Sequence, residues 1–487
     1  MRLSPASTPL PDHPANWPGY RPEDAGNGIV HLGLGAFARA HIAAYTDGAM
    51  AAAGGDWRMT GVSLRGEDVA QALNPQGGRY TLIERSGVPQ ARVIGSIAGV
   101  IAGGNLSERV LAAMAQPDCR IVSITVTEKG YGLLRSGGCD LSHPAVAADL
   151  QNPSAPRGVL GLISQGLALR LAANLAPFVV LCCDNLPENG ALLRAAVIDF
   201  ARRAHGPALA GRIEAEVAFP STMVDRITPA ATAKTRADAA ALTGYTDEAA
   251  IETEPFSQWV IEDRFPAGRP EWEAAGALFV PDVAPYEKMK LRMLNGSHSM
   301  LAYAGFLSAK VHVCDVMADA ALGTLVRRHM AAAAATLPAM AMDLAAYAAS
   351  LCDRFSNPSI AHETRQIAMD GTQKLPQRIF APALDTLAAG GDPAPFAFAT
   401  AAWMRYALGR DDQGHSYPLN DPREAELQAA LQGIRQEDPA AVVAAPAAVP
   451  GFLPDRPAEG PFAGATTLRL ERMLRLGMAQ AIQAEAP

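Results

Sequence analysis

Lys290, Asn295 and His298 fall within one short segment of the chain. If the segment is an α-helix, in which each residue turns by roughly 100°, the three side chains share one face with Glu287. A buried lysine without a charge partner can transfer a proton near neutral pH, because burial disfavours its ammonium form. An amide can donate to a carbonyl oxygen, and an imidazole can hold a hydroxyl. This set of side chains suits the oxidation of an alcohol or the reduction of a ketone.

The same segment allows a simpler interpretation, in which a surface lysine precedes an Asn-Gly pair that ends a helix. In an ideal α-helix Lys290 and His298 lie about 12 Å apart along the axis. Both side chains could then reach one ligand only if the ligand were elongated or if the helix were broken near Gly296.

A second candidate site is a glycine turn near the start of the chain. The pattern Gly33-x-Gly35-x-x-Ala38 lies between an apolar run and the beginning of a helix, as in dinucleotide-binding folds. Gly33 would make the tight turn, Gly35 would let a pyrophosphate approach, and Ala38 would allow close packing of helix on strand. Unpaired N–H groups at the helix start would bind the phosphates.

The nature of the dinucleotide depends on the next strand, expected over Trp57–Leu64 and followed by Asp68. An acidic residue at this place would bind the adenosine ribose hydroxyls and repel a 2′-phosphate, so NAD is favoured over NADP. Arg65, in contrast, would favour the 2′-phosphate of NADP. The alternative for Asp68 is a solvated loop carboxylate without a role in binding.

Further elements must position these residues. Two more apolar strands are expected over Arg120–Val126 and Phe178–Cys183, and each is followed by polar residues where open α/β sheets bind ligands. From Glu287 onward alanine- and leucine-rich segments predict helices. The expected fold class is therefore α/β, with a Rossmann-type NAD-binding domain over 1–285 and a mainly α-helical substrate and catalytic domain over 286–487. Helices are expected over Leu307–Met330, Pro338–Ser350, Pro382–Ala389 and Thr467–Glu485, with an exposed connection over Ala440–Pro461.

Composition excludes several functional classes. A net charge of −8 gives no electrostatic reason to expect a nucleic acid as partner. The apolar stretch Ala331–Ala349 is interrupted by Pro338 and Asp343, so it indicates a buried helix pair instead of a membrane span. Residues Met1–Gly19 lack the apolar core of a signal peptide, and a cytoplasmic location is expected. The scattered cysteines show no metal-binding spacing, so we expect neither zinc nor disulfides.

Six ordered motifs make the chain resemble the polyol-specific long-chain dehydrogenase family, which includes mannitol 2-dehydrogenases and fructuronate reductases. The resemblance implies a metal-independent enzyme with a Rossmann-type domain and a helical domain, often monomeric, acting on a small sugar acid or polyol. The motifs are Gly33–His41, Thr127–Tyr131, Cys183–Leu186, Met223–Arg226, Glu254–Asp263 and Lys290–His298.

Roles follow from this resemblance, residue by residue. It implies that Lys290 is the general acid/base, and that the amides of Asn185 and Asn295 polarise the carbonyl. The other implied roles are substrate contacts for Asp225 and His298, a proton relay for Glu128, and cofactor contacts for Phe37 and Arg39 within the glycine motif.

Within the family, the chain is more similar to the fructuronate reductases (D-mannonate oxidoreductases). Lys129 stands where mannitol dehydrogenases typically carry glycine, and Gln366 stands where they place a substrate-binding arginine. A uronate also carries a carboxylate, which needs a cation, and Lys129, Lys374 and Arg378 are candidates. The implied reaction is the NAD-dependent interconversion of D-fructuronate and D-mannonate.

Three alternatives stay open at this point. A mannitol or arabinitol 2-dehydrogenase would act on a neutral substrate and would need no cationic pocket. A tagaturonate reductase would differ only in stereochemistry. A nucleotide-binding sensor without catalysis is disfavoured, because Lys290, Asn185 and Asn295 are all present.

Overall fold

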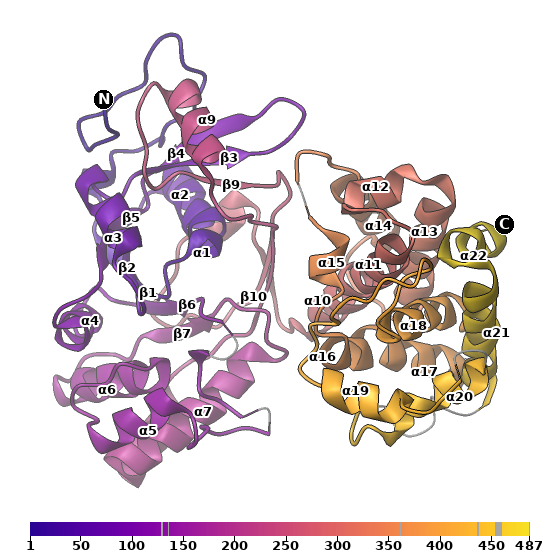
Figure 1. Cartoon of the computed structure of the whole chain (residues 1–487). Helices are drawn as coiled ribbons and strands as arrows, with labels where there is room; N and C mark the ends of the chain where they lie inside the picture. The colour runs from indigo at the N-terminus through magenta and orange to yellow at the C-terminus, as the bar shows by residue number, and fades with distance from the viewer. Residues whose placement is uncertain (128–129, 135, 361, 436–437, 453–459, 487) are drawn as a thin grey trace. The chain divides into compact units, whose positions relative to one another are not determined.

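The computed structural model describes residues 1–127, 130–134, 136–360, 362–435, 438–452 and 460–486. The chain forms two compact units, Met1–Ala284 and Pro285–Pro487 (Figure 1). Each unit has its own core, and each is described separately below.

The first unit is built on a sheet of five parallel strands in the order β5-β2-β1-β6-β7. Alternate residues of each strand face opposite sides, as the pleat requires. Val30 and Leu32 of β1 pack in one core with α4, α6 and α7, whereas Ile29 packs in the other with α2. The strands are β1 (Asn27–Leu32), β2 (Arg58–Val62), β5 (Ile97–Ile101), β6 (Ile121–Ile124) and β7 (Val179–Cys182).

Helices follow most of these strands, so both sheet faces are covered and the strands are almost wholly buried. Strand order reverses beside β1, which is the switch point where open α/β sheets bind ligands. The helices of this unit are α1 (Ala36–Ala40), α2 (Ile42–Ala53), α3 (Asp68–Leu73), α4 (Leu106–Met114), α5 (Pro144–Gln151), α6 (Val159–Ala172), α7 (Asn189–His205), α8 (Pro207–Glu216) and α9 (Ala233–Thr243).

Two small three-stranded sheets complete the first unit, and the sequence patterns had not indicated them. In one, β3 (Tyr80–Glu84) lies between β4 (Gln90–Ile94) and β9 (Ile251–Thr253). The other has the order β11-β10-β8, with strands β8 (Thr222–Asp225), β10 (Gln258–Glu262) and β11 (Leu278–Val280).

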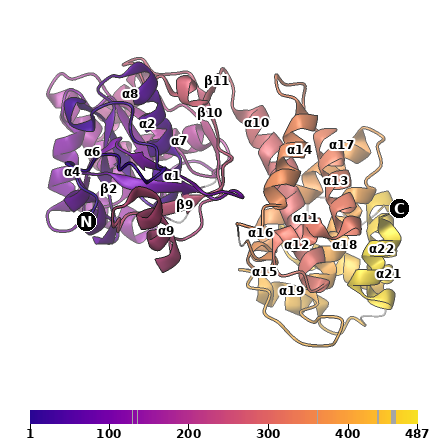
Figure 2. The same ribbon diagram turned by 90° about the horizontal axis from the view of Figure 1, so that it is seen from above.

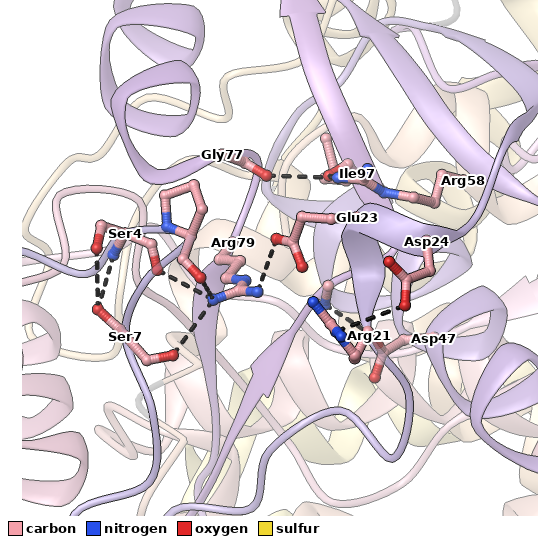
Figure 3. A network of polar contacts seen from close by, with 12 residues as sticks. Ser4, Ser7, Arg21, Glu23, Asp24, Asp47, Arg58, Gly77, Arg79 and Ile97 are labelled. Carbon is pink, nitrogen blue, oxygen red and sulfur yellow. Dashed lines mark hydrogen bonds and ion pairs between the residues drawn. The ribbon is translucent and has the colours of Figure 1, made fainter.

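The amino-terminal segment is fixed to this unit by backbone and side-chain bonds. Leu3 N–H donates to the Thr246 carbonyl, and Thr246 N–H donates to the Met1 carbonyl, both at 2.9 Å. The buried Arg79 guanidinium donates to the carbonyls of Ser4 and Ser7, at 3.1 and 3.3 Å, and to Glu23 at 2.7 Å (Figure 3). One arginine thus joins the start of the chain to the body of the sheet unit.

The second unit is mainly helical, with no β-strand among its described residues, and the expected fold class is confirmed (Figure 2). Helix α11 is its buried centre and packs against α13, α15 and α18. Its helices are α10 (Ala284–Met289, beginning one residue before the unit), α11 (Gly296–Leu307), α12 (Val313–Ala318), α13 (Ala320–Ala334), α14 (Leu344–Phe355), α15 (Thr364–Ile367), α16 (Gly371–Leu375), α17 (Ala381–Ala388), α18 (Ala394–Ala407), α19 (Glu424–Leu431), α20 (Pro439–Ala444), α21 (Gly460–Leu476) and α22 (Met478–Glu485).

Several helix boundaries differ from the sequence prediction. The single helix expected over Leu307–Met330 is wrong, because α11 ends at Leu307 and two further helices follow. The helix expected over Thr467–Glu485 is interrupted at Gly477, where φ is +80°. The connection over Ala440–Pro461 was expected to be exposed, but Val442 and Val443 within it are buried. Alanine-rich composition predicts helix well but does not show where a helix must turn.

Two stretches of the second unit are wound as π-helices, in which each N–H bonds to the carbonyl five residues earlier. They are η5 (Lys290–Asn295) and η6 (Pro376–Phe380), and they pack against each other. At the end of η5, Gly296 N–H bonds to the Leu291 carbonyl. π-Helical turns are rare and occur frequently at functional sites. Both stretches contain residues that the sequence singled out.

Candidate active site

The glycine turn after β1 has the geometry that its residue types predicted. Gly33 has φ of +88°, and an added Cβ would lie 2.1 Å from the Thr125 carbonyl oxygen, so only glycine fits. Its N–H bonds to the Val62 carbonyl, and its own carbonyl accepts from Gly35 N–H. At Gly35 an added Cβ would meet only the Gly33 carbonyl, at 3.9 Å, which leaves open space beside the turn.

The three residues after the turn have different surroundings. Ala38 is fully buried in the core, as close packing of helix on strand requires. Phe37 is half-buried and stacks on His41, with ring centroids 5.1 Å apart. The buried Arg39 donates to the carbonyls of Gly35 and Ala249. Its guanidinium therefore supports the turn from within the protein, and a direct contact between Arg39 and the cofactor stays a prediction.

Two neighbouring cavities lie in the first unit, and the glycine turn lines one of them. One, of about 530 Å³, is lined by Gly33, Gly35 and Thr125. The other, of about 790 Å³, is lined by Gly104 and Asn105. The two share Ser63, Leu64, Arg65 and Arg157. Each has the volume of an ordinary small-molecule site, and together they form an extended site at the switch point of the sheet.

Glu67 lines the larger cavity, together with Glu108 and Asp149, whereas the next residue, Asp68, begins α3 and is not among the lining residues. Glu67 is thus a further candidate to bind the ribose hydroxyls, beside the Asp68 of the sequence prediction. Arg157 was missed altogether, because nothing in its local sequence distinguishes it from any exposed arginine.

Candidate residues also follow the carboxyl ends of later strands. Asn185 is exposed and lies just after β7, and Asp225 is buried at the end of β8. Glu128 and Lys129 lie outside the described residues. The roles that the resemblance assigns to these four residues stay predictions.

Asp184, next to Asn185, holds the segment after β6. Its Oδ2 accepts from the Tyr131 hydroxyl at 2.6 Å and from Val126 N–H at 2.7 Å. Burial raises the pKa of Asp184 to about 6, although both hydrogen bonds favour the ionised form. Sequence reasoning passed over this carboxylate because it named only the neighbouring amide.

We expect this carboxyl group to make stability depend on pH. Because its pKa is higher in the folded state than the ordinary value of about 4, its stabilising contribution is complete below about pH 4 and is lost as pH rises through 6. Relative to Asp184→Asn, the free energy of unfolding of the wild type should fall by about 1 kcal/mol between pH 5 and pH 7. Urea unfolding of both proteins across that range measures the difference, and a constant difference would contradict the assignment.

In the second unit, Lys290 begins the π-helical stretch η5, and its side chain is buried. The interpretation as a surface lysine is therefore wrong. Gly296 does not end the helix either, because its backbone is helical and α11 continues through it. An added Cβ at Gly296 would lie 3.0 Å from the Arg378 carbonyl oxygen, so glycine allows the close packing against η6. The π winding also means that 100° per residue does not apply between Lys290 and Asn295.

His298 lies in the first turn of α11 and is buried, with its ring stacked on Phe355 at 4.4 Å between centroids. His362 meets it edge-on at 5.4 Å. Among the described residues, no protein atom forms a hydrogen bond to His298 Nε2. Burial lowers the pKa of His298 well below its usual range. Nearby His362 and the positive charge of Arg354 lower it further. A neutral imidazole with an unused ring nitrogen is able to bind a substrate hydroxyl.

Lys374 and Arg378 lie close enough to lower the pKa of His298 as well. The Lys374 ammonium donates to the carbonyls of Ile367 and Met369 and lies 3.6 Å from Asp370. The half-buried Arg378 guanidinium donates to the Asn295 carbonyl at 3.4 Å and the Ser299 hydroxyl at 3.3 Å.

The electrostatic environment of Arg378 is unusual for a guanidinium. Burial lowers its pKa to about 10. In the part of the chain that the structure describes, it has no carboxylate within ion-pair distance. Its hydrogen-bond acceptors are neutral, and the charge of Asp370, beyond ion-pair distance, compensates the guanidinium only in part. The sequence could not show this, because the partners of Arg378 lie about eighty positions away in η5 and α11.

The described residues provide neither a metal-binding cluster nor a membrane-spanning helix. No three His, Cys, Asp or Glu side chains gather in an arrangement able to hold a metal ion. No helix is both long and apolar enough to cross a membrane.

The parallel sheet, the glycine turn and the cavities beside it define the class of protein: an oxidoreductase with a Rossmann-type nucleotide-binding domain. Sequence profiles identify the family. The Mannitol dehydrogenase Rossmann domain matches residues 27–274, and the Mannitol dehydrogenase C-terminal domain matches residues 282–455. The chain belongs to the mannitol dehydrogenase family, in agreement with the resemblance in its motifs.

Individual relatives agree with this membership. The oxidoreductase YdfI of Escherichia coli is 47% identical over 413 residues, covering 83% of this chain and 84% of that protein. The D-mannonate oxidoreductase of E. coli is 42% identical and covers 94% of this chain and 95% of its own length. A mannitol 2-dehydrogenase of Pyrenophora tritici-repentis is 40% identical, with coverages of 85% and 75%.

Two solved structures match nearly the whole chain. The mannitol 2-dehydrogenase of Pseudomonas fluorescens, in a ternary complex with NAD and D-mannitol, has a TM-score of 0.83 and 36% identity and covers 99% of both chains. A D-sorbitol dehydrogenase in substrate-free form has a TM-score of 0.90 and 32% identity, with coverages of 99% and 100%. Relatives of this family therefore act on polyols as well as on a sugar acid.

Proposed function

We propose that this protein is an NAD-dependent oxidoreductase that interconverts D-fructuronate and D-mannonate. The observation that supports a sugar-acid substrate is the environment of Arg378. Its guanidinium is half-buried and has no carboxylate within ion-pair distance in the described part of its unit. A desolvated cation of this kind gains from an anionic ligand, and the planar guanidinium matches a carboxylate in particular. The 42% identical D-mannonate oxidoreductase, whose name states such a substrate, supports the proposal.

The residues of the first unit fit NAD. The space beside Gly35 would accept the pyrophosphate, because glycine has no side chain to fill it. Glu67 in the larger cavity, and Asp68 by the sequence argument, would bind ribose hydroxyls and repel a 2′-phosphate. When bound, the cofactor would take a hydride from the alcohol carbon or deliver one to the carbonyl carbon.

The chain's own residues would supply the proton and the orientation. In the reducing direction Lys290 would give a proton to the developing alkoxide, and the Asn295 amide would donate to the same oxygen. His298, neutral and with a free Nε2 in the described structure, would hold a neighbouring substrate hydroxyl. Arg378, with Lys374 near it, would hold the carboxylate. Asn185 and Asp225 of the first unit are proposed for the same reaction on the family resemblance.

The test is NADH oxidation by the purified protein with D-fructuronate, D-tagaturonate and D-fructose, each at neutral pH. We expect kcat/KM for fructuronate to exceed that for fructose by about a hundredfold, the value of one charge-assisted contact of roughly 3 kcal/mol. Comparable values for the two ketoses would contradict a carboxylate-binding site. Preference for tagaturonate would keep the site and change the stereochemistry of the substrate.

A mannitol 2-dehydrogenase is the second candidate, and one observation favours it. The P. fluorescens enzyme, whose structure is a complex with D-mannitol, matches the chain over 99% of its length. A preference for fructose in the assay above would establish this candidate, and the uncompensated charge of Arg378 would then need another role.

A further inference from the structure

A chain of buried polar side chains lies beneath the glycine turn in the first unit. His31, the fifth residue of β1, is fully buried. Its Nδ1 lies 2.8 Å from the Ser123 hydroxyl and its Nε2 lies 2.9 Å from the Thr125 hydroxyl. The Thr125 hydroxyl lies 2.9 Å from the Gly33 carbonyl oxygen. An imidazole buried on a central parallel strand needs a reason, because its desolvation is costly.

The Gly33 carbonyl is the last group of this hydrogen-bonded series, and it determines the direction of every hydrogen bond in the series. A carbonyl oxygen can only accept, so the Thr125 hydroxyl donates to Gly33. Thr125 Oγ1 then accepts from Nε2–H of His31, and Nδ1 accepts from the Ser123 hydroxyl. His31 is thus the neutral Nε2–H tautomer. Burial lowers the pKa of His31 to about 3, so the imidazole keeps this form throughout the neutral range.

The Gly33 carbonyl, at the end of this hydrogen-bonded series, belongs to the most constrained residue of the turn. Gly33 O accepts from the Thr125 hydroxyl and from Gly35 N–H at once. These two donors fix the peptide between Gly33 and Leu34, whose orientation sets the direction of the following N–H groups. Thr125 and Gly33 both line the cavity in which the cofactor is proposed to bind.

We propose that His31 is a positioning residue for the dinucleotide: it orients the Thr125 hydroxyl, which fixes the Gly33 carbonyl and holds the phosphate-binding turn in its binding conformation. In this proposal His31 touches no ligand itself, and it acts on the Gly33 carbonyl of the turn, chiefly by orienting the Thr125 hydroxyl. The proposal rests on the nucleotide site of the proposed function. It explains why a histidine occupies the middle of a buried parallel strand, where aliphatic residues otherwise stand.

The test compares NADH affinity, measured by fluorescence titration, in variants along the chain. We expect His31→Phe and Thr125→Val to weaken NADH binding about tenfold, the value of one hydrogen bond of roughly 1.4 kcal/mol. Ser123→Ala, at the far end, should have a smaller effect. Thr243→Val is the matched control, because Thr243 is also buried and donates to a backbone carbonyl, that of Ala239 in α9. Its affinity should stay within about twofold of the wild type.

Nitrogen-15 NMR of protein labelled at its histidine rings supplies a second readout, the tautomer of His31. A merely structural role of His31 would not change this readout. The wild type should show His31 as the Nε2–H tautomer from pH 5 to pH 8, and Thr125→Val should disturb that signal. An Nδ1–H tautomer, or wild-type NADH affinity in folded His31→Phe and Thr125→Val, would overturn the inference. Absence of NADH binding by the wild type would instead overturn the proposed function, and the inference with it.

Discussion

Lys290→Met is expected to lower kcat for carbonyl reduction by about 10²–10⁴-fold, the usual contribution of a general acid. Lys290 is buried at the start of η5, and methionine keeps most of its volume while removing the proton. NADH affinity should stay near the wild-type value, because the glycine turn belongs to the other unit. Steady-state kinetics together with NADH titration separate the two effects.

Lys288 provides the matched control for this substitution. It lies two residues earlier, at the end of α10, and its side chain is 41% exposed in a long ion pair with Asp385. Lys288→Met should leave kcat within about twofold of the wild type, because exposed ion pairs contribute little. Wild-type turnover in Lys290→Met would remove Lys290 from the mechanism.

Arg378→Met is expected to lower kcat/KM for fructuronate by about 30–100-fold, while the rate with fructose changes less than about threefold. The physical reason is the partly desolvated guanidinium, whose acceptors among the described residues are the Asn295 carbonyl and the Ser299 hydroxyl. A substrate carboxylate would add the missing charge, whereas a neutral ketose cannot. Parallel kinetics with the two substrates measure this selectivity directly.

Two companion variants make the result specific. Arg378→Lys keeps the charge but loses the planar fork, so it should restore part of the fructuronate rate. Arg365→Gln removes an exposed arginine of α15 and should leave both substrates unaffected. An equal loss with fructuronate and fructose would mean that Arg378 acts through Asn295 and Ser299, as a support for η5, and not on a carboxylate.

Local sequence patterns predicted the parts of the site that depend on local geometry. Gly33 was predictable because a turn between strand and helix needs a positive φ, and the structure shows +88°. The helical second half was predictable from its alanine and leucine content. In both cases neighbouring residues carry the information, which is why one sequence is sufficient.

Long-range features were not predictable in this way. The stacking of His298 on Phe355 joins residues far apart in the sequence, and no pattern near either residue indicates the other. The π winding of η5 was missed because its residue types are those of an ordinary α-helix. Gly296 illustrates the same difficulty, since the close approach that its missing Cβ allows is to the Arg378 backbone of η6, far away in the sequence.

The attachment of the amino terminus to Thr246 has a consequence for synthesis of the protein. The chain is made from the amino end, so Leu3 must wait for its backbone partner until nearly the whole first unit has left the ribosome. Until then the segment Ser4–Ser7, to whose carbonyls Arg79 donates, has only part of its surroundings. The pairing that completes the sheet unit therefore forms late, as in folds with high contact order. The helical unit begins to emerge only a short stretch of chain later.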